Sequence, residues 1–378
     1  MKFRLISIIL IFYSLVLFAE EIEVEGYDYK LDLPETWELL DAENLAQISF
    51  TDMDHVAIFQ VISFPGDSFF TSKEIMEKIK KQLAADGESS RFLFNGQDSF
   101  FADFSFKAGT KPAKGHFIFI NGTDYDYSLM AFTPAEYYDV YKASLLSALD
   151  SFSLNQEGLL LPGPVSQFFY PFPGPNPEPK KIRLEGRKLE LKIDPDAEKV
   201  TQWVAEREAT LLSAYSVGSM DAWERFYRIL YRDSYSRLDD IASAVIGFYR
   251  EQKLDDISIA LKIMEWLQSF EYSRSNSVSD FLMPLTACSE MTGDCDSRAL
   301  IFLIFLDHLN IDAVLLVSPV FKHSAVGINQ KALKQQGALI PYKGEKYLYA
   351  ELTAKVKIGQ IAKDVSRLDA WTAFEVSY

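Results

Sequence analysis

The stretch that decides the fold of the C-terminal half reads Gly293-Asp294-Cys295-Asp296-Ser297-Arg298-Ala299-Leu300. A small turn is followed at once by an apolar run with helical spacing that continues to Leu309. Asp294 suits the N-cap position, because its side chain can accept a hydrogen bond from an unpaired main-chain amide one turn into the helix. Cys295 would then lie in the first turn, where the helix dipole favours thiolate, the nucleophilic form. The alternative is a plain buried cysteine, since free Cys behaves as a small apolar side chain.

Short strands are expected after this helix. The sequence predicts them at 313–318, at 323–328, which begins with His323, and at 347–353, which contains Glu351. A cysteine nucleophile needs a base that takes its proton and a third group that orients the base. The chain therefore carries, in this order, a cysteine on a helix, a histidine on one strand and an acid on another.

This order and spacing resemble the transglutaminase-like superfamily, the papain-like cysteine hydrolases and acyltransferases. The motifs of that family read Gly-x-Cys-x-x-x-Ala, then His-Ala or a close variant, then Tyr-x-(Asp/Glu)-x-Thr. Two features depart from the commonest pattern: Ser324-Ala325-Val326 follows the histidine, and the acid is Glu. Both features are similar to a bacterial subset that uses His-x-Ala-Val-Gly and Glu. The matching positions in this chain are Gly293, Cys295, Ala299, His323, Tyr349, Glu351 and Thr353.

The resemblance implies a catalytic triad of Cys295, His323 and Glu351. Cys295 would attack an amide or peptide carbonyl, His323 would act as base and then as acid, and Glu351 would fix the ring tautomer. Gln268 resembles the upstream polar element of the family, so its side-chain N–H and the main-chain N–H of Cys295 are expected to bind the oxyanion. A solvent-facing Gln268 on a helix is the alternative. This chemistry needs no metal and no cofactor, and we expect neither.

Residues 1–19 have the pattern of a secretory signal peptide. Lys2 and Arg4 give a basic start, an apolar run extends from Leu5 to Phe18, and Ala19 is a small residue at the expected cleavage site. The protein is therefore expected in the periplasm or outside the cell, or anchored at its N-terminus if the segment is not cleaved. No later stretch is long and apolar enough to predict a membrane span.

Composition and charge exclude some partners. The chain of 378 residues has a formal net charge of −16, which argues against nucleic acid, because phosphate contacts need basic surface. The same charge disfavours binding to anionic lipid. The two cysteines, Cys288 and Cys295, could form a disulfide in an oxidising compartment. A permanent disulfide would leave Cys295 without a free thiol and therefore unable to act as a nucleophile.

Residues 20–155 are predicted to form a first domain, an antiparallel sheet flanked by helices, in an α+β protein. Strands are expected near 27–33, 57–62, 91–94, 99–106, 115–120 and 125–132, with helices at 72–83 and 134–149. The chain is expected to turn out of the first strand between Pro34 and Trp37, and Ser72 is expected to N-cap the first helix. Three short sequence motifs also resemble motifs of the PsbP-like fold. They are Leu33-Pro34-x-x-Trp37, the aromatic strand from Gly115 to Ile120, and Leu149-Asp150-Ser151-Phe152.

Residues 156–180 are predicted to be a linker, because Pro162-Gly163-Pro164 and the prolines of 171–179 exclude helix and central strand and leave the run extended. The aromatic residues at 168–172 indicate that the linker packs on a domain. Residues 181–378 are expected to form the second domain, which resembles the transglutaminase-like fold. The sequence predicts a hairpin at 181–192, then helices, then an antiparallel sheet. A helix expected from 222 to about 252 carries Arg225, Arg228 and Arg232 near one face. These arginines either bind a substrate carboxylate or, as we prefer, pair with acids such as Glu224, Asp233 and Asp240.

The sequence therefore predicts a cysteine peptidase or amidase of the transglutaminase-like type, a hydrolase or acyltransferase that acts on a protein or peptide substrate in the cell envelope. One alternative is a non-catalytic transglutaminase-like module that binds or scaffolds envelope partners. Another is a structural envelope protein in which Cys295 is a core residue. Retention of Cys, His and Glu together favours the enzyme, because an inert module would not need all of them.

Overall fold

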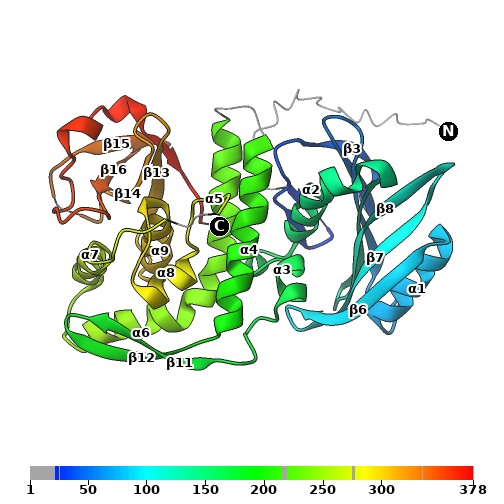
Figure 1. The fold of residues 1–378 in the computed structure, drawn as a ribbon, viewed down its shortest axis with the longest axis horizontal. Helices are drawn as coiled ribbons and strands as arrows, with labels where there is room; N and C mark the ends of the chain where they lie inside the picture. Colours follow the sequence, from blue (N-terminus) through cyan, green and yellow to red (C-terminus); the bar gives the residue numbers. More distant parts are fainter. Residues whose placement is uncertain (1–21, 25, 215–218, 275–276, 334, 378) are drawn as a thin grey trace, which may run out of the picture.

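The structure is a computed structural model that describes residues 22–24, 26–214, 219–274, 277–333 and 335–377. The expected signal peptide, residues 1–19, lies outside these ranges. Helices and antiparallel sheets make up both halves of the chain, so the predicted α+β class is confirmed. In Figure 1 one sheet lies toward each end of the molecule, with long helices between them. None of the helices in the described ranges is apolar over a length that would span a bilayer.

The N-terminal half is built on an antiparallel sheet in which strands near in sequence are mostly neighbours in space. The strands are β3 (Trp37–Asn44), β4 (Gln47–Asp52), β5 (Ile58–Pro65), β6 (Asp86–Phe94), β7 (Gln97–Ala108), β8 (Lys111–Asn121) and β9 (Tyr125–Pro134). Their order across the sheet is β3-β4-β5-β9-β8-β7-β6. A smaller sheet of the same half joins β1 (Ile22–Val24), β2 (Tyr29–Leu31) and β10 (Ser153–Leu154).

Helices cover both faces of the large sheet. On one face, α1 (Ser72–Leu83) packs Ile75 and Ile79 against aromatic side chains of β7 and β8. On the other face, α2 (Tyr138–Asp150) packs Leu145 and Leu149 against apolar side chains of β5 and β8. Because both faces are covered, the central strands are buried on both sides and read as nearly continuous apolar runs.

The sequence missed the start of this sheet. It predicted that the chain turns away near Trp37, whereas β3 runs along the sheet edge to Asn44. The sequence did not predict β3 because this strand is polar, mostly exposed and irregular in its pairing with β4, so apolar and polar residues alternate only weakly along it. The predicted N-cap of α1 was also one residue late, because the side chain of Thr71, not Ser72, accepts the hydrogen bond from the Glu74 N–H.

The predicted linker is partly helical and buried. Its helix α3 (Pro164–Phe169) leaves Val165 and Gln167 only 0 % and 1 % exposed. The prediction that Pro164 excludes helix was wrong, because proline at the first helical position loses no hydrogen bond. The chain then forms a hairpin, close to the predicted position, with Pro179 in a strand that has a free edge. The hairpin strands are β11 (Glu178–Leu184) and β12 (Arg187–Ile193).

The C-terminal half has helices followed by an antiparallel sheet, in the order that the sequence predicted. The helices are α4 (Pro195–Ala214), α5 (Met220–Tyr235), α6 (Asp239–Arg250), α7 (Asp256–Leu267), α8 (Pro284–Glu290) and α9 (Cys295–His308). The strands are β13 (Ala313–Ser318), β14 (His323–Asn329), β15 (Leu339–Tyr342), β16 (Glu345–Ala350) and β17 (Thr372–Phe374), in the order β15-β16-β14-β13-β17.

Helix α9 is the centre of this half. Its residues from Ser297 to Leu306 are buried, and they pack against β13, β14 and α7. The sequence predicted one helix from 222 to about 252, but the chain bends at a short 3₁₀ turn, Ser236–Leu238, which separates α5 from α6. Apolar side chains on both parts face the same core, so the helical periodicity continues across the bend.

Buried charges join the two halves, and most of the arginines among them belong to α4 and α5, helices that lie between the two sheets in Figure 1. The Arg228 guanidinium donates to both carboxylate oxygens of Asp32 at 3.0 and 2.8 Å, and Asp32 is 1 % exposed. Arg225 lies 2.8 Å from Glu208, and Arg232 donates to main-chain carbonyl groups of residues 150–152. The preferred interpretation as ion-pairing residues is confirmed for Arg225 and Arg228, although their shortest ion pairs are with Glu208 and Asp32 and not with the acids that the sequence suggested. For Arg232 it is not, because its hydrogen bonds go to main-chain carbonyl groups.

Candidate active site

Cys295 occupies the first turn of α9, as its local sequence predicted. The Asp294 side chain caps the helix by accepting a hydrogen bond from the Ser297 N–H at 2.9 Å. Gly293 allows this entry, because it has a φ of +151° and a Cβ built on it would lie 3.0 Å from Ser297 Cβ. The Cys295 side chain is almost covered, since the residue is 2 % exposed.

His323 and Glu351 form a close pair. His323 begins β14, Glu351 follows the last residue of β16, and these strands are neighbours in the sheet. His323 Nε2 lies 3.0 Å from Glu351 Oε2. The predicted imidazole and carboxylate are therefore brought together although they are 28 residues apart in the chain.

The Glu351 carboxylate is held on both oxygens by the residues of the predicted motif. Tyr349 Oη donates to Oε2 at 2.8 Å, while the Thr353 N–H and hydroxyl donate to Oε1 at 2.8 and 2.6 Å. Burial alone would raise the pKa of Glu351, but the hydrogen bonds from His323 and Thr353 outweigh it and lower the pKa to about 2. The carboxylate is thus ionised and oriented toward the ring.

Cys295 lies beside the His323 backbone. Its sulfur accepts a hydrogen bond from the main-chain N–H of Ser324, the residue that follows the histidine. His323 Nε2 contacts Glu351, so Nδ1 is the ring nitrogen left for a thiol. No thiol–imidazole hydrogen bond occurs within the described ranges, where the side-chain partner of the sulfur is Asp296. Contact between the thiol and the ring therefore stays a prediction.

The charge around the sulfur differs from the prediction. Cys295 Sγ lies 3.6 Å from Asp296 Oδ2 and can donate to it. Burial, followed by the negative charges of Asp296 and Asp294, raises the pKa of the Cys295 thiol above its ordinary value. The expectation that the helix dipole favours thiolate was therefore wrong for this arrangement, because a covered sulfur beside two carboxyl groups retains its proton.

Asp296 is the centre of a polar cluster that the sequence analysis missed. Its Oδ1 accepts hydrogen bonds from Tyr227 Oη at 2.6 Å and from the Ser324 hydroxyl. Burial and the charge of Asp296 raise the pKa of Tyr227 well above its ordinary value, so the phenol remains a donor. Only the position of Asp296 next to Cys295 was visible in the sequence, because Tyr227 comes from α5, 69 residues earlier.

Gln268 has neither of the roles that the sequence suggested. Its side-chain amide donates to the main-chain carbonyl oxygens of Glu351 at 2.8 Å and Val356 at 3.0 Å. The residue is 7 % exposed, so it does not face solvent. Both amide hydrogens are used within the fold, and in this arrangement Gln268 fixes the backbone at Glu351 and is not directed at an oxyanion.

Arg298 ties the segments around the site together, a function that the sequence analysis also missed. It lies one turn after Cys295 in α9 and is 1 % exposed. Its guanidinium donates to the carbonyl oxygens of Gly293 at 3.1 Å, Phe270 at 3.0 Å and Leu352 at 3.1 Å. The turn before the cysteine, the segment after α7 and the segment after Glu351 are thus held by one side chain.

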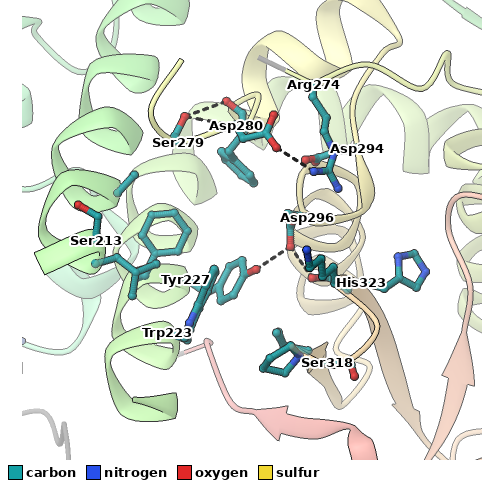
Figure 2. A pocket seen from close by; sticks show the side chains of 18 of the residues that line it. Ser213, Trp223, Tyr227, Arg274, Ser279, Asp280, Asp294, Asp296, Ser318 and His323 are labelled. Atoms are coloured by element: carbon teal, nitrogen blue, oxygen red, sulfur yellow. Dashed lines mark hydrogen bonds and ion pairs between the residues drawn. The ribbon is translucent and has the colours of Figure 1, made fainter. Parts of the chain in front are cut away.

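An open pocket of about 510 Å³ adjoins this site. Figure 2 shows Trp223 and Tyr227 on one side of it and Arg274, Asp294 and Asp296 on the other. His323 and Ser324 also line the pocket, whereas Cys295, which is 2 % exposed, is not among the lining residues although both its chain neighbours are. The site therefore has a covered sulfur, an oriented imidazole–carboxylate pair and adjoining space for a ligand. Cys288 and Cys295 are both free thiols.

Comparisons with known proteins assign no family. No protein-family model matches the chain, and no curated protein is similar to it in sequence. Among solved structures, a PsbP protein from the cyanobacterium Synechocystis has a TM-score of 0.31 at 12 % identity, covering 38 % of this chain and 96 % of its own. A Bacteroides thetaiotaomicron protein has a TM-score of 0.27 at 11 % identity, covering 59 % and 80 %. LpqN of Mycobacterium tuberculosis, described as involved in cell envelope biogenesis, has a TM-score of 0.24 at 12 % identity, covering 33 % and 81 %.

Proposed function

We propose that this protein is a transglutaminase-like cysteine hydrolase or acyltransferase that cleaves an amide or peptide bond in the cell envelope. The observation that carries the proposal is the His323–Glu351 pair, 3.0 Å apart, beside a cysteine at a helix N-terminus. The extracytoplasmic location rests on the signal-peptide pattern of residues 1–19.

The proposed reaction begins with transfer of the Cys295 thiol proton to Nδ1 of His323. The thiolate then attacks the carbonyl carbon, and the main-chain N–H of Cys295, at the start of α9, stabilises the oxyanion. The protonated imidazole donates to the leaving amine, and a thioester to Cys295 remains. Water completes hydrolysis, whereas an amine acceptor would complete acyl transfer. Glu351 keeps the ring oriented throughout.

The contact between Cys295 and Asp296 implies that the free protein is in a resting form. The thiol faces a carboxylate 3.6 Å away, so the sulfur must turn toward His323 before the proton can be transferred. We propose that rotation about the Cys295 side chain brings the sulfur to this ring, because the main-chain N–H that interacts with the sulfur belongs to Ser324, the residue after His323. We propose that substrate binding in the adjoining pocket accompanies this rotation.

A second candidate function is a non-catalytic envelope scaffold. The burial of the sulfur favours this second function, since Cys295 is 2 % exposed and the pKa of its thiol is raised. In that case the His323–Glu351 pair would only support the sheet. The two candidates differ in the reactivity of Cys295, because a nucleophilic thiol must reach the thiolate form in contact with solvent or substrate.

The test is the rate of iodoacetamide alkylation at Cys295 as a function of pH, followed by mass spectrometry of the mature protein. Cys288→Ala is the matched control, because Cys288 is 0 % exposed and should contribute no fast reaction. If the protein is a cysteine hydrolase, iodoacetamide should alkylate Cys295, and the rate should be lower in His323→Ala. If Cys295 does not react, the scaffold function is supported.

A cleavage assay completes the test. Cys295→Ala should abolish release of amine from peptide amides, while its melting temperature changes by only a few degrees. If the variant unfolds instead, Cys295 is a packing residue. A folded Cys295→Ala protein that still cleaves the substrates would refute the proposed nucleophile.

A further inference from the structure

The pocket beside the candidate triad is walled mainly by apolar side chains. It lies between α4 and α5 on one side and the start of α9 with the β13–β14 turn on the other. Its volume of about 510 Å³ is within the range of small-molecule and side-chain binding sites. The apolar walls include Leu212, Trp223, Phe226, Val278, Phe281 and Pro319.

Most polar side chains of the pocket already have protein partners. Arg274 donates to Asp280 at 2.8 Å, and the Ser279 hydroxyl donates to Glu206 at 2.6 Å. Asp296 accepts from Tyr227 at 2.6 Å (Figure 2). A charged ligand would have to break these pairs, whereas an apolar group can fill the space and leave them intact.

The pocket opens next to the reacting groups. Asp294 and Asp296 line it, and Cys295 lies between them in the chain. His323 also contributes to the lining, and its ring lies on the far side of Asp296 from Tyr227 in Figure 2. A group bound against Trp223 would therefore belong to the part of the substrate close to the scissile bond.

We propose that this pocket is a specificity subsite for a large apolar or aromatic side chain on the acyl side of the bond that Cys295 attacks. The inference rests on the proposed function for the reaction, but the binding step can be measured without it. The apolar side chain removes water from Trp223 and Phe226, whereas a charged side chain would have to compete with the paired groups of the wall. Lys322 also lines the pocket, at an exposed position.

The first experiment compares chloromethyl ketones of N-acetylphenylalanine, N-acetylalanine and N-acetylglutamate. Each forms a thioether with the Cys295 sulfur and releases chloride, and intact-protein mass spectrometry gives the rate. We expect the phenylalanine reagent to react at least about tenfold faster than the alanine reagent, and the glutamate reagent to be the slowest. Iodoacetamide, which has no side chain, measures the intrinsic reactivity of the thiol.

A charge placed on the pocket wall provides the structural test. Val278→Asp should remove the preference for phenylalanine, because Val278 lines the pocket and is 70 % exposed, so the variant can fold. The matched control is Val140→Asp on α2 of the N-terminal half, where Val140 is 78 % exposed. The control should retain the preference.

The second experiment measures binding without chemistry. N-acetylphenylalaninamide is titrated into Cys295→Ala protein and into the same protein carrying Val278→Asp, with intrinsic tryptophan fluorescence as the readout. Binding that weakens at least about tenfold in the double variant supports the subsite. Absence of binding in the Cys295→Ala protein overturns it.

The outcomes separate the two proposals. If iodoacetamide alkylates Cys295 quickly but the phenylalanine and alanine reagents react at equal rates, the subsite is overturned and the hydrolase remains. If no reagent alkylates Cys295 but N-acetylphenylalaninamide binds and Val278→Asp weakens it, the subsite remains and the hydrolase is overturned. Faster reaction of the glutamate reagent also overturns the apolar subsite.

Discussion

The thiol of Cys295 lies 3.6 Å from the carboxylate of Asp296, its neighbour in the first turn of α9. Because Asp296 is also fixed by Tyr227 and Ser324, it cannot swing away without the loss of both hydrogen bonds. The Asp296 charge therefore opposes the effect of the helix dipole: it raises the pKa of the Cys295 thiol, so the sulfur keeps its proton. In this state Cys295 should react with alkylating reagents more slowly than it would without the Asp296 charge.

Removal of the Asp296 charge should activate the thiol. In Asp296→Asn the amide oxygen can still accept from Tyr227, but the negative charge that raises the pKa of Cys295 is gone. We expect that pKa to fall and the iodoacetamide rate at pH 7.5 to rise about tenfold, as for a shift of about one unit. Asp256→Asn, at the first residue of α7, is the control and should not change the rate. An unchanged rate in Asp296→Asn would show that burial alone protects the sulfur.

The Glu351 carboxylate should make stability depend on acid pH. Its pKa is lowered from an ordinary value of 4.5 to about 2 in the folded protein, so the unfolded chain binds the proton more readily. The stabilisation is complete above pH 4.5 and is lost as the pH falls through about 2. Its size is about 3 kcal/mol at neutral pH.

Urea unfolding of Glu351→Gln at pH 7 and pH 3 measures this contribution. The variant should lose stability at pH 7 and show a smaller difference between the two pH values than the unsubstituted protein. Glu345→Gln on the same segment, an exposed partner of Lys331, is the control. Equal pH dependence in Glu351→Gln and the unsubstituted protein would contradict the lowered pKa.

The buried pair of Arg228 and Asp32 should be needed to hold the two halves together. Arg228→Met removes the guanidinium and leaves the Asp32 carboxylate, which is 1 % exposed, without its bidentate partner. A cost of about 3 kcal/mol in the free energy of unfolding is expected, because the buried Asp32 charge then keeps a less close ion pair with Arg225, at 3.7 Å.

The matched control for the interface is Arg91→Met. Arg91 pairs with Asp98 at the surface, and its side chain is 67 % exposed, so the cost should be below about 1 kcal/mol. Equal losses in the two variants would mean that Arg228 contributes no more than a surface ion pair. Chemical unfolding followed by far-UV circular dichroism gives both values.

His116 should remain neutral at physiological pH. Burial lowers its pKa to about 4, and its Nε2 lies 2.8 Å from Tyr138 Oη. Since the unfolded imidazole titrates near 6.5, the unfolded chain binds more protons below that pH, and stability falls as the pH decreases from 6.5 to about 4. The ring proton resonances of His116 should not titrate between pH 8 and pH 5. His116→Gln should remove this loss of stability, whereas His55→Gln, at an exposed position, should not.

Local sequence rules were sufficient for the start of α9 and for much of the sheet order along the chain. The N-cap bond of Asp294 reaches only to Ser297, so residues within one turn determine it. The strand that begins with His323 and the strand that ends just before Glu351 were found, because alternating apolar residues and turn residues identify strands without knowledge of their partners.

Features that depend on distant partners were not predicted. Gln268 looked like an oxyanion residue on sequence grounds, but its partners, Glu351 and Val356, are more than 80 residues away. The bend between α5 and α6 was missed because both helices have apolar residues at helical spacing and no proline separates them.

By itself the sequence determined which residues could form a nucleophile, a base and an orienting acid, and on which helix and strands they lie, because those assignments follow from residue type and short-range periodicity. Only the tertiary structure decided the state of the sulfur. The fold covers Cys295 and places Tyr227 of α5 against Asp296. The helix N-terminus by itself should favour thiolate, but burial and the carboxylate raise the pKa of the thiol, so the sulfur retains its proton. The pKa of a side chain depends on burial and on charged groups from several helices and strands, so a local sequence pattern does not predict it.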